Sequence, residues 1–99
     1  MMKVAIPSSD KITINKSIYD CEGFLIYQID DHNLVDYEFR ANGKKSADEI
    51  TILLEDCSSI ICNKIEPEVK DLLKANKKQI LRTSEENVKK AVLNMLCRI

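Results

Sequence analysis

The first half of the chain carries short runs rich in Val, Ile, Phe and Tyr, at residues 3–6, 24–29 and 34–39. Runs of this length and composition are typical of β-strands. The second and third runs are separated by the polar residues 30–33, which end in an Asn that tolerates a positive φ. We therefore predict a hairpin in which the second and third strands are antiparallel neighbours.

The second half of the chain alternates helical spacing with two short apolar runs, at residues 59–62 and 79–81. This alternation is typical of βα units. Right-handed crossovers make the first, fourth and fifth strands parallel, and the hairpin makes the second strand antiparallel to them. The sequence thus predicts one α/β domain over residues 1–99, a three-layer mixed five-stranded sheet with three helices.

Helix-start signals precede each of three amphipathic segments. Ser46 and Glu49 have the spacing of a capping box, Pro67 suits the first position of a helix, and Thr83 with Glu86 has the spacing of a second capping box. The apolar faces predicted to cover the sheet are Ala47, Ile50, Leu53 and Leu54, then Val69, Leu72 and Leu73, and finally Val88, Ala91, Val92, Met95, Leu96 and Ile99.

Composition narrows the partners of this domain. The chain is 44% hydrophobic and 31% charged, with a formal net charge of -1, so no global field attracts nucleic acid or an anionic membrane. The charge is uneven, because residues 1–63 sum to -5 and residues 64–99 to +4, which we interpret mainly as solvated helix faces. Without a secretory signal or a membrane-spanning run, a cytoplasmic protein with reduced cysteines is expected.

The four cysteines divide between the two edges of the predicted sheet. Ligands of open α/β sheets gather beyond the carboxyl ends of the parallel strands, where Cys62 ends the fourth strand and the loop carrying Cys21 returns. Cys57 and Cys97 fall on the opposite edge, where we expect small buried hydrophobic residues. Cys21 and Cys62 are the candidate metal ligands, and burial is the alternative for each of them.

An enzyme is not expected from these residues. A two-metal nuclease needs converging carboxylates, and the first strand offers Val4, Ala5 and Ile6 with no acid in its middle. The chain's one histidine, His32, lies on the hairpin at the edge opposite Cys21 and Cys62. Neither thiol therefore has an imidazole base within reach.

Several local motifs, together with the order of elements, resemble the dinitrogenase iron-molybdenum cofactor biosynthesis family of small nitrogenase accessory factor-like proteins. The motifs are KVAIPS at 3–8, FLIY at 24–27, LEDC at 54–57 and IIC at 60–62, so the resemblance spans nearly the whole chain. It implies a ribonuclease-H-like fold and non-catalytic binding of an iron-molybdenum or iron-sulfur type cluster, as a carrier or chaperone. Its implied partners are cofactor-biosynthesis or metalloenzyme proteins.

Two motifs of that family are replaced at the predicted ligand edge. A His-Phe-Gly before the second strand is replaced by Ser17, Ile18 and Tyr19, and a Gly-Gly-x-Gly after the fourth strand by residues 63–66, Asn-Lys-Ile-Glu. A member that has lost cofactor binding and acts as a protein-interaction or regulatory module is thus the alternative. The residues expected to bind the cofactor are Cys21, Cys62, Ser17, Tyr19, Asn63 and Lys64.

Overall fold

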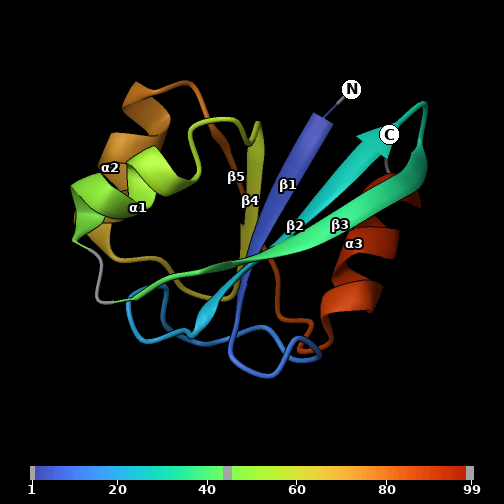
Figure 1. The fold of residues 1–99 in the computed structure, drawn as a ribbon, viewed down its shortest axis with the longest axis horizontal. Coiled ribbons are helices and arrows are strands. Elements are labelled where there is room, and N and C mark those ends of the chain that lie inside the picture. Colours follow the sequence, from blue (N-terminus) through green and yellow to red (C-terminus); the bar gives the residue numbers. More distant parts are fainter. Residues whose placement is uncertain (1, 44–45, 98–99) are drawn as a thin grey trace.

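The computed structural model describes residues 2–43 and 46–97 and contains a five-stranded sheet with order β3-β2-β1-β4-β5. In Figure 1, α1 and α2 lie on one side of the sheet and α3 on the other, which is the predicted three-layer α/β architecture. The elements are β1 (Met2–Ser8), β2 (Gly23–Asp30), β3 (Asn33–Ala41), α1 (Ala47–Leu53), β4 (Ser59–Cys62), α2 (Pro67–Ala75), β5 (Gln79–Arg82) and α3 (Val88–Cys97).

The strand directions confirm the predicted topology. β2 is antiparallel to both β1 and β3, whereas β1, β4 and β5 are parallel to one another. The carboxyl ends of the three parallel strands therefore lie at one edge of the sheet. The loop between β1 and β2, the β4–α2 turn and the β5–α3 connection all lie at this edge (Figure 1).

Alternating side chains divide the core into two apolar layers. Ala5, Phe24, Ile26 and Ile60 are fully or almost fully buried on the face covered by α1 and α2. The opposite face packs against α3 and contains Val4, Ile6, Leu25, Tyr27, Ile29 and Ile61. Sheet residues buried on both faces explain why β1, β2 and β4 appear in the sequence as nearly continuous hydrophobic runs.

The starts of α1 and α2 agree with the sequence signals. The Ser46 hydroxyl accepts a hydrogen bond from the Glu49 amide, and the Glu49 carboxylate accepts one from the Ser46 amide, so the predicted capping box is present. Pro67 begins α2, as predicted. Val69 and Leu73 of this helix are buried against α1 and the sheet.

The start of α3 was predicted wrongly. The helix begins at Val88, and the Asn87 side chain accepts from the Lys90 amide in the position of the cap. The Thr83 hydroxyl instead accepts from the Glu85 amide and forms part of the connection that follows β5. The predicted box spacing was present, but the backbone is not helical there because the chain must first cross to the other face of the sheet. Ile99, assigned to the same apolar stripe, lies outside the described residues.

The β2–β3 hairpin is present, although its positive φ angles fall on other residues than predicted. Asp31 and His32 have φ angles of 50° and 65°, whereas Asn33 already pairs with Asp30 in the ladder. Two consecutive left-handed residues match the twist of the flanking strands. His32 is exposed on this turn, at the opposite end of the strands from the loop that carries Cys21.

Candidate functional site

Two adjoining hollows lie at the carboxyl edge of the parallel strands. The larger has a volume of about 570 Å³ and extends toward the end of β5, and the smaller, of about 380 Å³, extends toward the start of α2. Lys16 and Lys64 line both. Their other lining residues are Asn63, Arg82, Thr83, Ser84 and Glu86 in the larger hollow, and Ser17, Ile65 and Glu66 in the smaller.

Three cationic side chains dominate the charge of this edge. Lys16 comes from the loop after β1, Lys64 from the turn after β4, and Arg82 from the end of β5, and all three are exposed. None of them forms an ion pair with another residue that the structure describes. The carboxylates lining the hollows are Glu66 and Glu86, so the site carries an excess of positive charge.

The β1–β2 loop is hydrogen-bonded to the start of α2 through two carboxylates, that of Glu66 at the N-cap and that of Glu68 in the first turn. The Ser17 hydroxyl donates to Glu66 Oε1 at 3.1 Å, and the Tyr19 hydroxyl donates to Glu68 Oε1 at 2.8 Å. Loss of solvent and the adjacent Glu68 carboxylate raise the pKa of Tyr19 to about 12, so this phenol is a proton donor at neutral pH. The N-terminus of α2 therefore already has negative side chains where the Gly-rich family motif exposes backbone amides.

A hydrogen-bonded side-chain amide, that of Asn63, lines the larger hollow. Asn63 donates from Nδ2 to the carbonyl oxygens of Thr83 at 2.8 Å and Glu85 at 3.0 Å. The Thr83 amide donates in turn to the Cys62 carbonyl at 2.9 Å. These hydrogen bonds hold the β4–α2 turn against the β5–α3 connection. They therefore fix the backbone at Lys64 and next to Arg82.

Asn42, which is completely buried, fixes the shape of the β1–β2 loop. Its Nδ2 lies 3.4, 3.2 and 3.2 Å from the carbonyl oxygens of Ile18, Tyr19 and Cys21, and 3.5 Å from Cys21 Sγ. The Asn42 side chain thus provides hydrogen-bond donors for the backbone carbonyl groups of the loop segment 18–21, which follows Ser17 and contains Tyr19. The sequence analysis did not single out this residue, because Asn42 follows the last predicted strand of the first half and belongs to no motif.

The thiols of Cys21 and Cys62 lie beneath the edge rather than in the hollows. Both belong to the apolar layer under α1 and α2, together with Cys57, and Cys62 is completely buried. Burial raises the pKa of all three thiols from 9.0 to about 11. At neutral pH they are protonated, whereas a metal ligand must be a thiolate. The expected burial of Cys57 is confirmed.

Cys97 differs from the other thiols. It ends α3 and is exposed, so the expectation that it is a small buried hydrophobic residue was wrong. The apolar stripe of α3 accounts for the error, since its buried residues are Val88, Ala91 and Val92 in the first half of the helix. In the last turn Met95 and Leu96 still pack against the core, whereas Cys97 faces solvent.

A thiol-reactivity assay should separate these environments. Ellman's reagent at pH 8 should modify Cys97 quickly in the native protein and modify the three core thiols only after denaturation, because they are buried and have raised pKa values. Cys97→Ser should remove the fast phase. A fast phase that survives in this variant would show that a core thiol is open to solvent.

The edge contains part of the predicted set and several residues that were missed. Ser17, Asn63 and Lys64 line the hollows as expected, and Tyr19 is linked to α2 beside them. Roles for these residues and for Cys21 and Cys62 in holding a ligand stay predictions. Ile65 and Glu66 belong to the 63–66 turn that was predicted at this edge, and both line the smaller hollow. The lining residues that were not predicted are Lys16, Arg82, Thr83, Ser84 and Glu86. The strand-end rule that selected Cys62 would have selected Arg82 if applied to β5.

This fold is a small α/β domain whose basic hollows lie at the carboxyl ends of three parallel strands. The family model for the dinitrogenase iron-molybdenum cofactor family matches residues 1–97, and the chain belongs to that family. None of the curated proteins matches the sequence. Among the described residues, no helix has the length and apolar character needed to span a bilayer.

Solved structures extend the comparison. A candidate dinitrogenase from Methanocaldococcus jannaschii shares 27% identity, with 98% of this chain and 89% of that chain covered and a TM-score of 0.82. A candidate NifB protein from Thermotoga shares 19% identity, with 99% and 89% covered and a TM-score of 0.75. The apo form of the orange protein from Desulfovibrio gigas shares 15% identity, with the same coverage and a TM-score of 0.79. The last two likenesses concern the fold alone.

Proposed function

We propose that this domain binds an anionic metal-sulfur cluster, of the iron-molybdenum or iron-sulfur type, at the carboxyl edge of its sheet and acts as a carrier or chaperone rather than an enzyme. The observation that carries the proposal is the convergence of Lys16, Lys64 and Arg82 around two adjoining hollows, none of them in an ion pair with a described residue. Membership of the iron-molybdenum cofactor family supports this cargo and partners among cofactor-biosynthesis or metalloenzyme proteins.

The donor set favours contact with the outside of a cluster rather than ligation of its metals. Cluster sulfides carry negative charge and accept hydrogen bonds, which ammonium, guanidinium and hydroxyl groups provide. Lys64 and Arg82 supply charge, and Thr83 and Ser84 supply hydroxyl groups. Ligation by Cys62 would require uncovering a buried thiol and removing its proton. Weak outer contacts suit a carrier, because cargo held in this way can be passed on.

Tetrathiomolybdate provides a small anionic metal-sulfur probe of this site. Under anaerobic conditions the protein should bind it with an affinity that falls as salt rises. Lys64→Ala and Arg82→Ala should each weaken binding about twofold to fivefold, because each removes one partly screened charge contact. Glu86→Gln should strengthen binding, because it removes a carboxylate from the same hollow. Difference absorbance and calorimetric titration measure these changes.

Matched variants separate charge from thiol chemistry. Lys74→Ala removes an exposed lysine in the last turn of α2 and should leave binding unchanged. Cys62→Ala should also leave the affinity unchanged while lowering stability. Binding that is lost in Cys62→Ala but retained in Lys64→Ala would contradict the proposal and establish thiol ligation.

The alternative function, an interaction module without cofactor, has one specific observation in its favour. Glu66, at the N-cap of α2, and Glu68, in its first turn, accept hydrogen bonds from Ser17 and Tyr19. The chain's own side chains therefore cover the start of α2, where residues 63–66 replace the family's Gly-rich motif. Failure to bind tetrathiomolybdate, together with failure to retain iron and sulfide after anaerobic reconstitution, would favour this alternative.

A further inference from the structure

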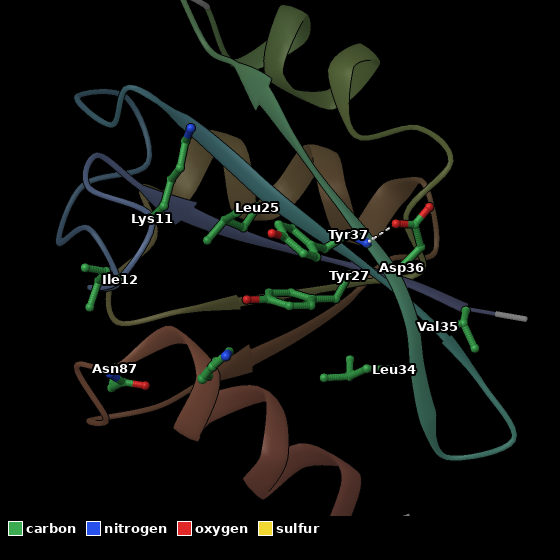
Figure 2. A pocket seen from close by; sticks show the side chains of 10 residues that line it. Lys11, Ile12, Leu25, Tyr27, Leu34, Val35, Asp36, Tyr37 and Asn87 are labelled. Atoms are coloured by element: carbon green, nitrogen blue, oxygen red, sulfur yellow. Dashed lines mark hydrogen bonds between the residues drawn. The ribbon is translucent and has the colours of Figure 1, made fainter.

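A further hollow lies on the face of the sheet that α3 covers, and it shares no lining residue with the two basic hollows. It has a volume of about 590 Å³ and is bounded by β2, β3, the β1–β2 loop and the start of α3. Figure 2 shows Tyr27 and Leu34 on the side of the sheet that faces α3, with Ile12 and Asn87 at the other end of the hollow. We refer to this surface as the β3 groove.

Exposed apolar side chains concentrate at the β3 groove. Ile12, Leu34, Val35 and Tyr37 all line it, with exposed fractions of 64%, 40%, 52% and 68%. Single exposed hydrophobic residues are ordinary, but four of them around one hollow indicate an interaction surface. The two other large exposed hydrophobics of the described residues, Ile52 and Leu93, lie apart from it on α1 and α3.

The groove adjoins the free edge of the sheet. β3 is the terminal strand of the order, and its nine residues pair only with β2 among the described elements. The Tyr37 amide points away from β2, since it donates to the Asp36 carboxylate at 2.8 Å instead of to a strand. The register leaves Val35 opposite no residue of β2. An added strand would therefore find main-chain groups on β3 and apolar side chains on the same face.

Charge indicates what kind of strand fits. Tyr37 and Phe39 lie opposite Tyr27 and Leu25, so their side chains share the α3 face. The charged residues that line the groove are Lys11, Asp36 and Lys89. Asp36 lies opposite Gln28 and so belongs to the other face of the sheet, whereas the Lys11 ammonium lies 4.9 Å from the centre of the Phe39 ring. A strand with apolar side chains flanked by acidic ones on the α3 face matches this pattern.

A second copy of this chain fits less well. Antiparallel pairing of two β3 strands centred on Tyr37 would place Asp36 of each copy directly opposite Glu38 of the other copy. Two such pairs of like charges are unfavourable. Pairing about Phe39 would match Glu38 with Arg40, but it would leave Leu34 and Val35 uncovered.

We propose that β3 and its groove bind an extended segment of a partner protein, which adds as a sixth strand and places apolar side chains between two acidic ones on the α3 face. The main-chain hydrogen bonds provide most of the docking geometry, and Lys11 and Lys89 select the charge of the segment. This surface is separate from the basic edge, so the proposal does not rest on cluster binding.

A designed peptide tests the proposal. The peptide Thr-Glu-Thr-Val-Thr-Ile-Thr-Glu-Thr should shift the amide resonances of Tyr37 and Phe39 in the ¹⁵N-labelled protein and slow their hydrogen exchange. Replacing both Glu residues by Lys should weaken binding about tenfold. N-methylation of the peptide at alternate residues should abolish it when the methyl groups face β3, because no ladder can then form.

Charge reversal on the protein supplies the matched control. Lys89→Glu should weaken binding of the acidic peptide and strengthen that of the lysine peptide, whereas Lys90→Glu, on the next residue of α3 and outside the groove lining, should do neither. Equal binding of both peptides, or shifts away from β3, would overturn the proposal. Concentration-dependent protection of the Tyr37 amide without peptide would overturn it in favour of a second copy.

Discussion

Replacing Gly23 with alanine should lower the free energy of unfolding by about 3 kcal/mol, because overpacking of a closed site forces backbone and side chains apart. Gly23 begins β2 and pairs with both Ser8 of β1 and Ala41 of β3. An added methyl group would overlap the Arg40 carbonyl oxygen and the ring of Phe39. Urea denaturation measures the loss.

A second substitution separates the effect of the clash with the Phe39 ring from that of the clash with the Arg40 carbonyl oxygen. Phe39→Leu removes the ring edge and should recover part of the loss in the Gly23→Ala background, but the Arg40 carbonyl belongs to the backbone and stays in place. A Gly23→Ala protein within about 0.5 kcal/mol of the wild type, the range of ordinary surface changes, would show that the strands can separate there at little cost.

Replacing Asn42 with alanine should cost about 2 to 3 kcal/mol, because buried carbonyl groups lose their donor. The carbonyl oxygens of Ile18, Tyr19 and Cys21 share the two hydrogens of this one amide. The Asn42 backbone amide donates to Glu22 and is unaffected by the change. The variant should also loosen the β1–β2 loop, so Cys21 should react with Ellman's reagent faster than in the wild type.

Asn63→Ala is the matched control for this prediction. Asn63 also donates to two backbone carbonyl groups, but it is only partly buried, so water can replace its amide and the expected cost is about 1 kcal/mol. If both variants lose the same stability, the burial of Asn42 is not what makes its hydrogen bonds important. If Cys21 in the Asn42→Ala variant stays as unreactive as in the wild type, the loop holds its shape without the amide.

Much of the fold followed from the sequence, because hydrophobic spacing and turn chemistry act locally. The five strands, the order of the helices and the α1 cap agree with the structure, since the residues that specify them are neighbours in the chain. The predicted start of α3 differs from the structure. Thr83 and Glu86 have the right spacing for a capping box, but the route of the chain across the sheet decides where the helix begins.

The site was less accessible to sequence reasoning. Cys62 was placed correctly at the end of β4, but a strand residue faces one of two sides, and the register places this thiol under α2. Lys16 and Arg82 meet Lys64 only when three loops reach the same edge. The excess of positive charge after residue 63 was interpreted as solvated helix faces. For this reason the sequence analysis did not assign Lys64 and Arg82 to one common basic surface.

The most direct test of cluster binding is the position of the metal itself. Crystals grown anaerobically with tetrathiomolybdate, measured at the molybdenum absorption edge, should show an anomalous peak in the hollows bounded by Lys16, Lys64 and Arg82. A peak at Cys21 or Cys62, or no molybdenum bound to the protein, would contradict the account.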